Sequence, residues 1–120
     1  MASTDKLLPV LYGIPNCDSV KQARAWLAER NQGYRFHDFK TKGLPEDRLD
    51  IWLQGPGWRT LLNRQGTTWR KLAIDQQAAV VDAASARALL LAQPSLVKRP
   101  VVEWPDGRIS VGLAGWVKPG

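Results

Sequence analysis

The order strand, helix, strand at the start of the chain is the feature that most restricts its fold. An apolar run over 7–14 predicts a buried strand, and the alternating residues of 34–41 predict a second strand near a sheet edge. Between them, core-facing residues recur at helical spacing: Val20, Ala23 and Leu27. Two strands joined by such a helix form a βαβ unit, which requires parallel strands and a right-handed crossover.

A block of helices is expected after the second strand. Helical segments are predicted over 44–54, 58–63, 67–72 and 82–93. Pro45 suits the first turn of the first of these helices, because its missing N–H is not needed there. Asp82 is expected to cap the last helix, and Pro94 to end it.

The remaining residues predict a β-hairpin. Asp106-Gly107 separates two strand-like runs, 101–104 and 108–113, and this pair favours a tight turn between strands. Too few residues follow for a stable closing helix, so we expect either a short chain end or Trp116 covering the core face. The whole pattern predicts one α/β domain over residues 1–120, with a helical insertion at about 44–94.

Composition narrows the classes of protein that the chain can belong to. Its 120 residues, 44% apolar and 23% charged, are typical of one soluble domain. No signal-peptide pattern and no run of about 20 apolar residues is found, which predicts a cytoplasmic protein with no membrane partner. The net charge of +6 favours anionic partners. Basic residues do not alternate with aromatic ones, which argues against a dedicated nucleic-acid-binding module.

Cys17 is the only cysteine and lies where the first strand turns into the helix. Asp18 or Ser19 is expected to cap that helix. The unpaired N–H groups and the dipole at a helix start can make a thiol nucleophilic. The alternative is an inert cysteine that packs as a small apolar residue. His37 is the only histidine, so no zinc-ligand spacing exists and no metal site is expected.

A second group of polar residues lies in the helical block. It comprises Asn63, Arg64, Thr67, Thr68 and Arg70. Guanidinium groups and hydroxyls suit a carboxylate ligand. Alternatively, Thr67 or Thr68 caps a helix and Arg70 pairs with Asp75. Lys21, one turn after the cysteine, either stabilises a thiolate or a bound carboxylate, or is a solvated surface residue.

Three sequence blocks in this order resemble the thioredoxin-like fold and, more narrowly, the arsenate reductase ArsC family. They are Tyr12-Gly13-Ile14-Pro15-Asn16-Cys17-Asp18-Ser19-Val20-Lys21-Gln22-Ala23, Leu61-Leu62-Asn63-Arg64-Gln65-Gly66-Thr67-Thr68-Trp69-Arg70-Lys71-Leu72 and Pro94-Ser95-Leu96-Val97-Lys98-Arg99-Pro100-Val101-Val102. The family includes the Spx regulators and the YffB-like proteins, and the YffB-like group is the most similar. The resemblance extends from about Leu11 to Leu113.

The resemblance implies a site. Cys17 would be the catalytic nucleophile, with Arg99 as a positively charged group near it and Arg99-Pro100 as a cis-proline turn facing the cysteine. The substrate-binding residues expected with them are Asn16, Lys21, Asn63, Arg64, Thr67, Thr68, Arg70 and Pro100.

Departures from the family pattern restrict the chemistry. Arsenate reductases of this family use three arginines, and only the one matching Arg99 is present, since Asn63 and about Val111 occupy the other positions. The second position of a Cys-x-x-Cys pair is Val20, which excludes an internal dithiol. The Cys-x5-Arg loop of a cysteine phosphatase would need arginine at position 23, where the chain has Ala23.

The function expected from these residues is single-cysteine thiol or disulfide exchange through Cys17, with no bound cofactor. Glutathione is the expected co-substrate, and another small thiol or a protein disulfide is a further possible partner. One alternative is a non-enzymatic, Spx-like regulator that docks on the RNA polymerase alpha subunit. Another is an arsenate reductase.

Overall fold

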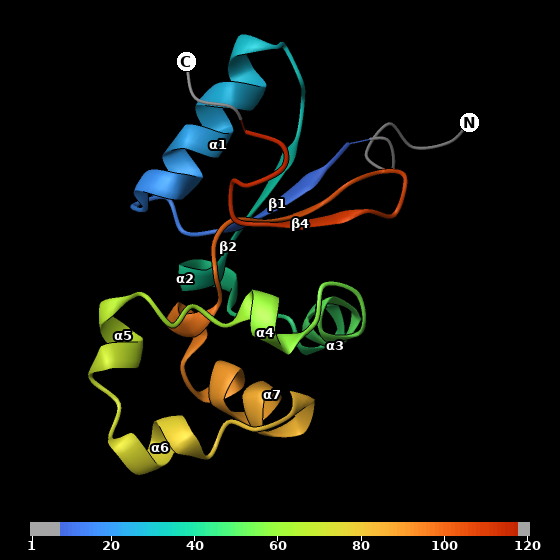
Figure 1. Ribbon diagram of the computed structural model, residues 1–120. Helices are drawn as coiled ribbons and strands as arrows, with labels where there is room; N and C mark the ends of the chain where they lie inside the picture. Colours follow the sequence, from blue (N-terminus) through green and yellow to red (C-terminus); the bar gives the residue numbers. More distant parts are fainter. Residues whose placement is uncertain (1–7, 118–120) are drawn as a thin grey trace. The chain divides into compact units, whose positions relative to one another are not determined.

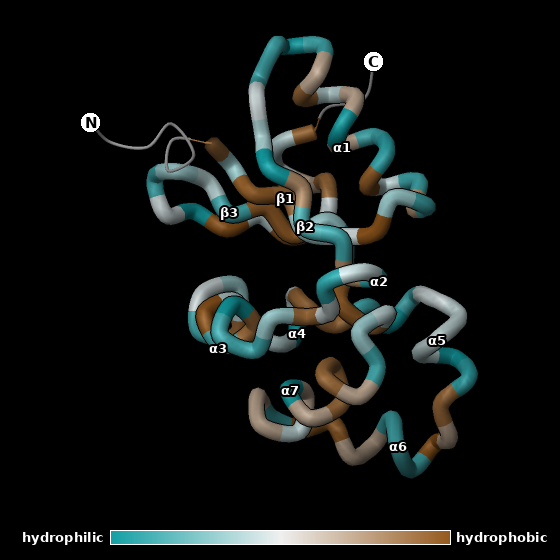
Figure 2. Tube along the Cα trace, turned by 180° about the vertical axis from the view of Figure 1, so that it is seen from behind, coloured by the Kyte–Doolittle hydropathy of each residue, from teal (hydrophilic) through white to brown (hydrophobic). Residues whose placement is uncertain are grey.

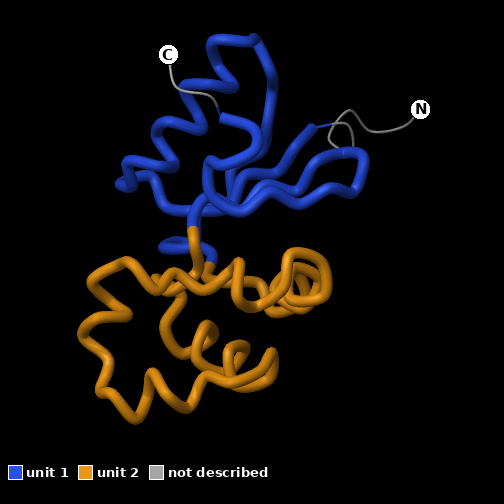
Figure 3. The backbone as a smooth tube through the Cα atoms, in the orientation of Figure 1, with its two compact units in different colours: residues 1–42, 99–120 blue, residues 43–98 orange. Residues whose placement is uncertain are grey.

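The computed structural model describes residues 8–117, which form two compact units (Figure 3). The sheet unit consists of 8–42 and 99–117, and the helical unit consists of Gly43–Lys98. Each unit is built on its own set of elements, a four-stranded sheet with one long helix in the first and a group of helices in the second. The single-domain organisation stays a prediction.

The sheet has the strand order β2-β1-β3-β4 (Figure 1). Its strands are β1 (Val10–Gly13), β2 (Arg35–Asp38), β3 (Val101–Glu103) and β4 (Ile109–Val111). β1 runs parallel to β2, with Tyr12 opposite His37, and antiparallel to β3, with Tyr12 opposite Val101. β3 and β4 form the antiparallel hairpin. The predicted βαβ unit, the edge position of β2 and the hairpin are therefore confirmed, while the start of the expected strand, Leu7, lies outside the described residues.

The core of the sheet unit lies between the sheet and α1 (Asp18–Glu29). The predicted helix stripe packs against Leu11 of β1 and Val102 of β3, and all five side chains are fully buried. Figure 2 shows the hydrophobic residues that run along β1. Burying one such aliphatic side chain contributes about 1.5–3 kcal/mol, so this contact fixes the helix on the sheet.

Trp116 packs against the same core. Its ring lies 5.4 Å from that of Trp26 and 5.2 Å from that of Trp104, both nearly perpendicular to it. Its indole N–H donates to the carbonyl oxygen of Gly112 at 2.9 Å. The expectation that Trp116 covers the core face is therefore confirmed.

The helical unit contains five α-helices and a short 3₁₀-helix. They are α3 (Glu46–Gln54), α4 (Trp58–Leu61), α5 (Thr67–Arg70), α6 (Ile74–Ala78), α7 (Ala83–Ala92) and η2 (Pro94–Leu96). Trp52 of α3 and Leu90 of α7 are fully buried. The Arg87 guanidinium joins the two helices, since its Nε lies 2.6 Å from a carboxylate oxygen of Asp50.

Two sequence-based expectations about the elements are wrong. The strand predicted over 34–41 ends at Asp38, and α2 (Phe39–Lys42) takes up its last residues. The Asp38 carboxylate accepts the backbone N–H of Lys40 at 2.8 Å, a local bond that favours a helical turn. Helix α6 is not predicted from the sequence. None of its side chains is buried, so it has no core-facing apolar stripe that would indicate a helix.

Asp82 caps α7, as expected, and links helix stability to pH. Its carboxylate accepts the backbone N–H of Ser85 at 2.8 Å, and this bond together with the Ser85 hydroxyl lowers the pKa of Asp82. A lowered pKa adds stability above the unfolded-state pKa of about 3.9, and that stability is lost as pH falls through the folded-state value. Asp82→Ala should therefore lower the melting temperature at neutral pH, with the difference disappearing in acid.

Thermal melts of both proteins from neutral pH to about pH 2 measure this difference. Asp75→Ala is the matched control, because it removes a carboxylate from the first turn of α6. A deficit for Asp82→Ala that stays constant down to the lowest pH would contradict the linkage.

Candidate active site at the start of helix α1

Cys17 is the N-cap residue of α1 and lies four residues after the end of β1. Its backbone is extended (φ −144°, ψ 126°), and its carbonyl oxygen accepts the backbone N–H of Lys21 at 2.9 Å. Its side chain is half-buried and makes no capping hydrogen bond. The expectation that Asp18 or Ser19 caps the helix is wrong, because Asp18 is already the first helical residue.

The first turn of α1 has backbone N–H groups without a hydrogen-bond acceptor among the described residues. Within residues 8–117, no protein group accepts the backbone N–H groups of Asp18, Ser19 or Val20. These donors and the dipole of a 12-residue helix lie directly after the cysteine. A negatively charged sulfur or a ligand oxygen placed there would satisfy donors that the chain leaves unpaired.

Gly13 allows the strand to approach the helix closely at this turn. A Cβ atom at Gly13 would lie 2.6 Å from Cγ2 of Val20, far inside van der Waals contact. The fully buried Val20 lies in the first turn of α1, so a displacement of its side chain would move the residues next to Cys17. Glycine at position 13 therefore sets the spacing between β1 and the cysteine turn.

Gly13→Ala is expected to destabilise the protein by about 1–3 kcal/mol, the usual result of overpacking a core. Chemical denaturation measures the loss. Val20→Ala removes the methyl group that would clash with the new Cβ atom. Gly13→Ala should therefore lower the free energy of unfolding less in a Val20→Ala background than in the native protein. Equal losses in the two backgrounds would show that this contact does not restrict position 13.

The Arg99-Pro100 peptide bond is cis, as expected. Tyr12 lies opposite Val101, so Pro100 lies beside the end of β1, where the loop to Cys17 begins. Pro100 is buried, and its carbonyl oxygen accepts the backbone N–H of Gly112 at 2.8 Å. Arg99 is half-buried and forms no ion pair with any residue that the structure describes.

Asn16 and Lys21 flank the cysteine and are both exposed. Neither side chain makes a hydrogen bond to another residue in 8–117. The sheet unit thus supplies the open helix start, the half-buried thiol, two exposed polar side chains and the cis-proline turn.

The expected binding residues of the helical unit lie on the loop before α5 and on α5 itself. The backbone N–H of Asn63 donates to the carbonyl oxygen of Leu96 at 2.8 Å, and its side-chain oxygen accepts the N–H of Gln65 at 3.0 Å. Thr68 and Ser95 share a hydroxyl hydrogen bond of 3.2 Å. These bonds fix the loop against the residues around η2.

Both alternative roles considered for this loop, a threonine cap and an Arg70–Asp75 ion pair, are wrong. Gly66 is the N-cap of α5, so neither Thr67 nor Thr68 caps it. The guanidinium of Arg70 donates to the carbonyl oxygen of Gln65 and forms no ion pair with Asp75. Thr67 and Arg64 are exposed.

Asn63 and Arg64 also line a cavity of about 360 Å³, together with two cations that were not among the expected site residues, Arg59 and Lys98. The sequence carries a signal for Arg59, a run of basic residues without an acid: Arg59, Arg64, Arg70 and Lys71 are the only charged residues between Pro56 and Ala73. Lys98 lies outside this run, and only the fold brings it to the cavity.

Residues 8–117 contain no group of three or more His, Cys, Asp or Glu side chains that could hold a metal ion. No helix in the same range is long and apolar enough to cross a membrane. The expected lack of a metal and of a bound cofactor stays a prediction.

A protein-family model for the ArsC family matches residues 12–114, which include the end of β1, the cysteine turn, the helical unit and the hairpin. The chain belongs to the ArsC family. This confirms the thioredoxin-like α/β fold and the family resemblance read from the three sequence blocks.

Individual relatives agree with the family assignment. An uncharacterised protein of Haemophilus influenzae is 38% identical over 103 residues, covering 86% of this chain and 89% of its own. The global transcriptional regulator Spx of Streptococcus agalactiae is 28% identical over 94 residues, covering 77% and 67%.

Solved structures of ArsC-family relatives share the fold. A YffB protein has a TM-score of 0.81 and 47% identity, covering 92% of this chain and 99% of its own. An arsenate reductase (ArsC) related protein from Brucella melitensis has a TM-score of 0.73 and 52% identity, covering 90% and 88%. An arsenate reductase from Vibrio cholerae, at 16% identity and a TM-score of 0.74, supports the fold alone.

Proposed function

We propose that this ArsC-family protein catalyses thiol–disulfide exchange through Cys17, with glutathione as the small thiol. The observation that carries the proposal is the placement of its only cysteine at the N-cap of α1, half-buried and beside backbone N–H groups that no residue in 8–117 accepts. Anions are stabilised at such a helix start, and a thiolate is the nucleophilic form of cysteine.

The reaction follows from a single thiol. The Cys17 thiolate attacks one sulfur of a disulfide, forms a mixed disulfide and releases the other sulfur as a thiolate. With one cysteine in the chain, an external thiolate must attack the mixed disulfide next. When glutathione holds the mixed disulfide and a second glutathione attacks, the products are oxidised glutathione and the regenerated Cys17 thiolate.

The exposed residues beside Cys17 supply groups for a substrate. Lys21 and Asn16 are free of hydrogen bonds to described side chains, and Arg99 forms no ion pair with a residue in 8–117. Glutathione bears two carboxylates, which ammonium and guanidinium groups bind well. The positive net charge of the chain favours the approach of such an anion.

Arsenate reduction is less well supported. Two arginines of the arsenate-reductase pattern are missing, at Asn63 and at about Val111, and Val111 lies in β4 opposite Val101. An arsenate adduct on Cys17 would have less positive charge around it. An assay for arsenate-dependent thiol consumption decides this alternative, and no consumption above the protein-free rate is expected.

The test of the glutathione proposal is the alkylation rate of Cys17 by iodoacetamide at neutral pH. The native protein should react faster than the same chain unfolded in urea, and S-methylglutathione, which cannot form a disulfide, should slow the native reaction. The unfolded chain is the control for direct effects of the additive. Equal native and unfolded rates without protection would contradict both a reactive thiol and a glutathione site.

The Spx relatives favour one alternative, a regulator that binds the RNA polymerase alpha subunit. A pull-down at low salt with the purified alpha subunit tests it. Binding that survives Cys17→Ser would support a docking function without thiol chemistry, whereas no binding would count against it.

A further inference from the structure

A cavity in the helical unit is lined by cations and by no acid. Its volume is about 360 Å³. The lining residues are Arg59, Thr60, Leu62, Asn63, Arg64, Gln65 and Lys98. No carboxylate of the described chain forms an ion pair with any of the three cations. Three like charges around one cavity repel one another, and a bound anion would relieve that repulsion.

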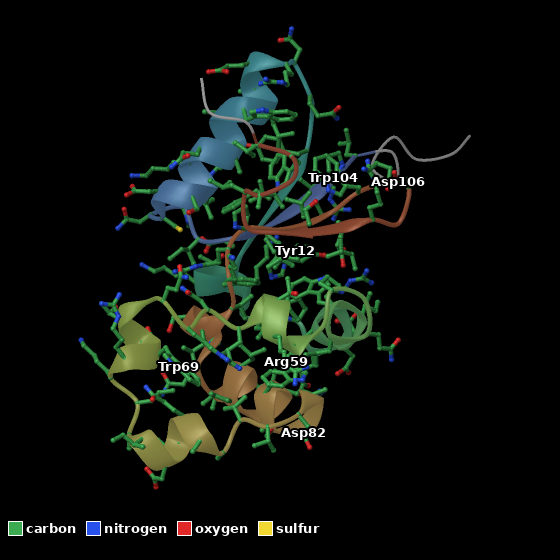
Figure 4. All side chains as sticks on the ribbon, in the orientation of Figure 1. Tyr12, Arg59, Trp69, Asp82, Trp104 and Asp106 are labelled. Carbon is green, nitrogen blue, oxygen red and sulfur yellow. The ribbon has the colours of Figure 1, made fainter. Side chains whose placement is uncertain are left out.

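Aromatic rings hold both guanidinium groups in place. The Arg59 guanidinium carbon lies 4.7 Å from the ring centroid of Trp58, and that of Arg64 lies 5.6 Å from Trp58 and 5.8 Å from Trp69. These distances are within the range of cation–π attraction. Figure 4 labels Arg59 on α4 and Trp69 on α5. Side chains held in this way lose less entropy when they bind a ligand.

The backbone of the cavity wall is also fixed. Asn63 bonds to Leu96 through its N–H, and Lys98 bonds to Leu61 through its N–H at 2.7 Å. A Cβ atom at Gly66 would lie 2.9 Å from the Asn63 amide nitrogen, so the loop closes tightly on that side chain. The cations therefore project from a wall that tertiary hydrogen bonds hold in shape.

We propose that this cavity binds a small ligand with two linked phosphate groups. Guanidinium groups bind phosphate through paired hydrogen bonds, and lysine binds it as a point charge. Two phosphates carry several negative charges, which match three cations that have no carboxylate partner in the described chain. The Thr60 hydroxyl and the amides of Asn63 and Gln65 add neutral hydrogen-bonding groups. A ligand that carries an ammonium group, such as glutathione, finds no acid among the lining residues, so the cavity favours a ligand with negative charges alone.

Calorimetric titration of the full chain with inorganic pyrophosphate tests the proposal. We expect saturable binding at one site that weakens with added salt. Arg59→Gln and Arg64→Gln should each weaken it about tenfold or more, because each removes a charge-assisted hydrogen bond. Lys71→Gln is the control, since it removes a positive charge at the C-cap of α5, and Lys71 is not among the residues that line the cavity.

Three results would overturn the proposal: no saturable binding of pyrophosphate, an equal loss of affinity for Lys71→Gln and Arg64→Gln, or glutathione binding as tightly as pyrophosphate. The titration involves no thiol reaction, so its outcome is independent of whether Cys17 exchanges disulfides. Circular dichroism of each variant shows whether a lost affinity reflects a lost fold.

Discussion

Cys17→Ser is expected to abolish glutathione-dependent disulfide reduction, leaving only the uncatalysed rate of glutathione itself. The chain has no second cysteine to take over the reaction. A serine hydroxyl stays protonated at neutral pH and cannot form a mixed disulfide. To measure the loss, the protein is supplied with glutathione and a small disulfide, and the formation of oxidised glutathione is followed.

The same variant should fold at least as well as the native protein, which separates lost chemistry from lost structure. Cys17 is the N-cap of α1 and makes no capping hydrogen bond with its side chain. Serine is a preferred N-cap residue, so the variant should gain up to about 1 kcal/mol of stability. Activity that persists in Cys17→Ser would exclude Cys17 as the nucleophile. A large loss of stability would instead contradict the N-cap geometry.

Trp52→Ala is expected to destabilise the protein by about 3–5 kcal/mol, the usual cost of emptying an aromatic core position. Trp52 is the largest fully buried side chain in residues 8–117 and lies in α3 of the helical unit. Typical domains have only about 5–15 kcal/mol of total stability. The variant should therefore unfold at much lower urea concentration.

Ile51→Ala is the matched control for Trp52→Ala, because Ile51 is the next residue of α3 and is 40% exposed. It should cost much less than the loss at Trp52. Equal losses at the two positions would contradict the burial of Trp52.

The same experiment tests the single-domain prediction. Cys17 lies in the sheet unit and Trp52 in the helical unit. If both units unfold together, Trp52→Ala should shift the urea midpoint for Cys17 alkylation as far as it shifts the midpoint for loss of helix. An unchanged alkylation midpoint would show that the sheet unit is stable alone.

Much of the fold could be predicted because its signals are local. The helical spacing of Val20, Ala23 and Leu27 predicts their burial against the sheet. Asp106-Gly107 predicts the turn that pairs β3 with β4. The cis bond at Arg99-Pro100 was predicted from family resemblance, and the bond is cis.

The elements that escaped prediction lack such signals. In α6, Ile74 is 84% exposed, so this apolar residue does not mark a buried face of the helix. The alternation of 34–41 continued past Asp38, whose side chain turns the chain into α2. The cavity of the helical unit brings Lys98 together with Arg59 and Arg64, residues more than thirty positions earlier, and this contact depends on the pairing of Leu62 with Val97.

The most direct test of the account is the mass of the intact protein after brief exposure to oxidised glutathione. Thiol exchange at Cys17 predicts one added glutathione, mapped to the peptide that contains Cys17 and removed by reduced glutathione. The adduct should form faster on the native protein than on the chain unfolded in urea. No adduct on the native protein, or one that forms only after unfolding, would contradict the proposed function.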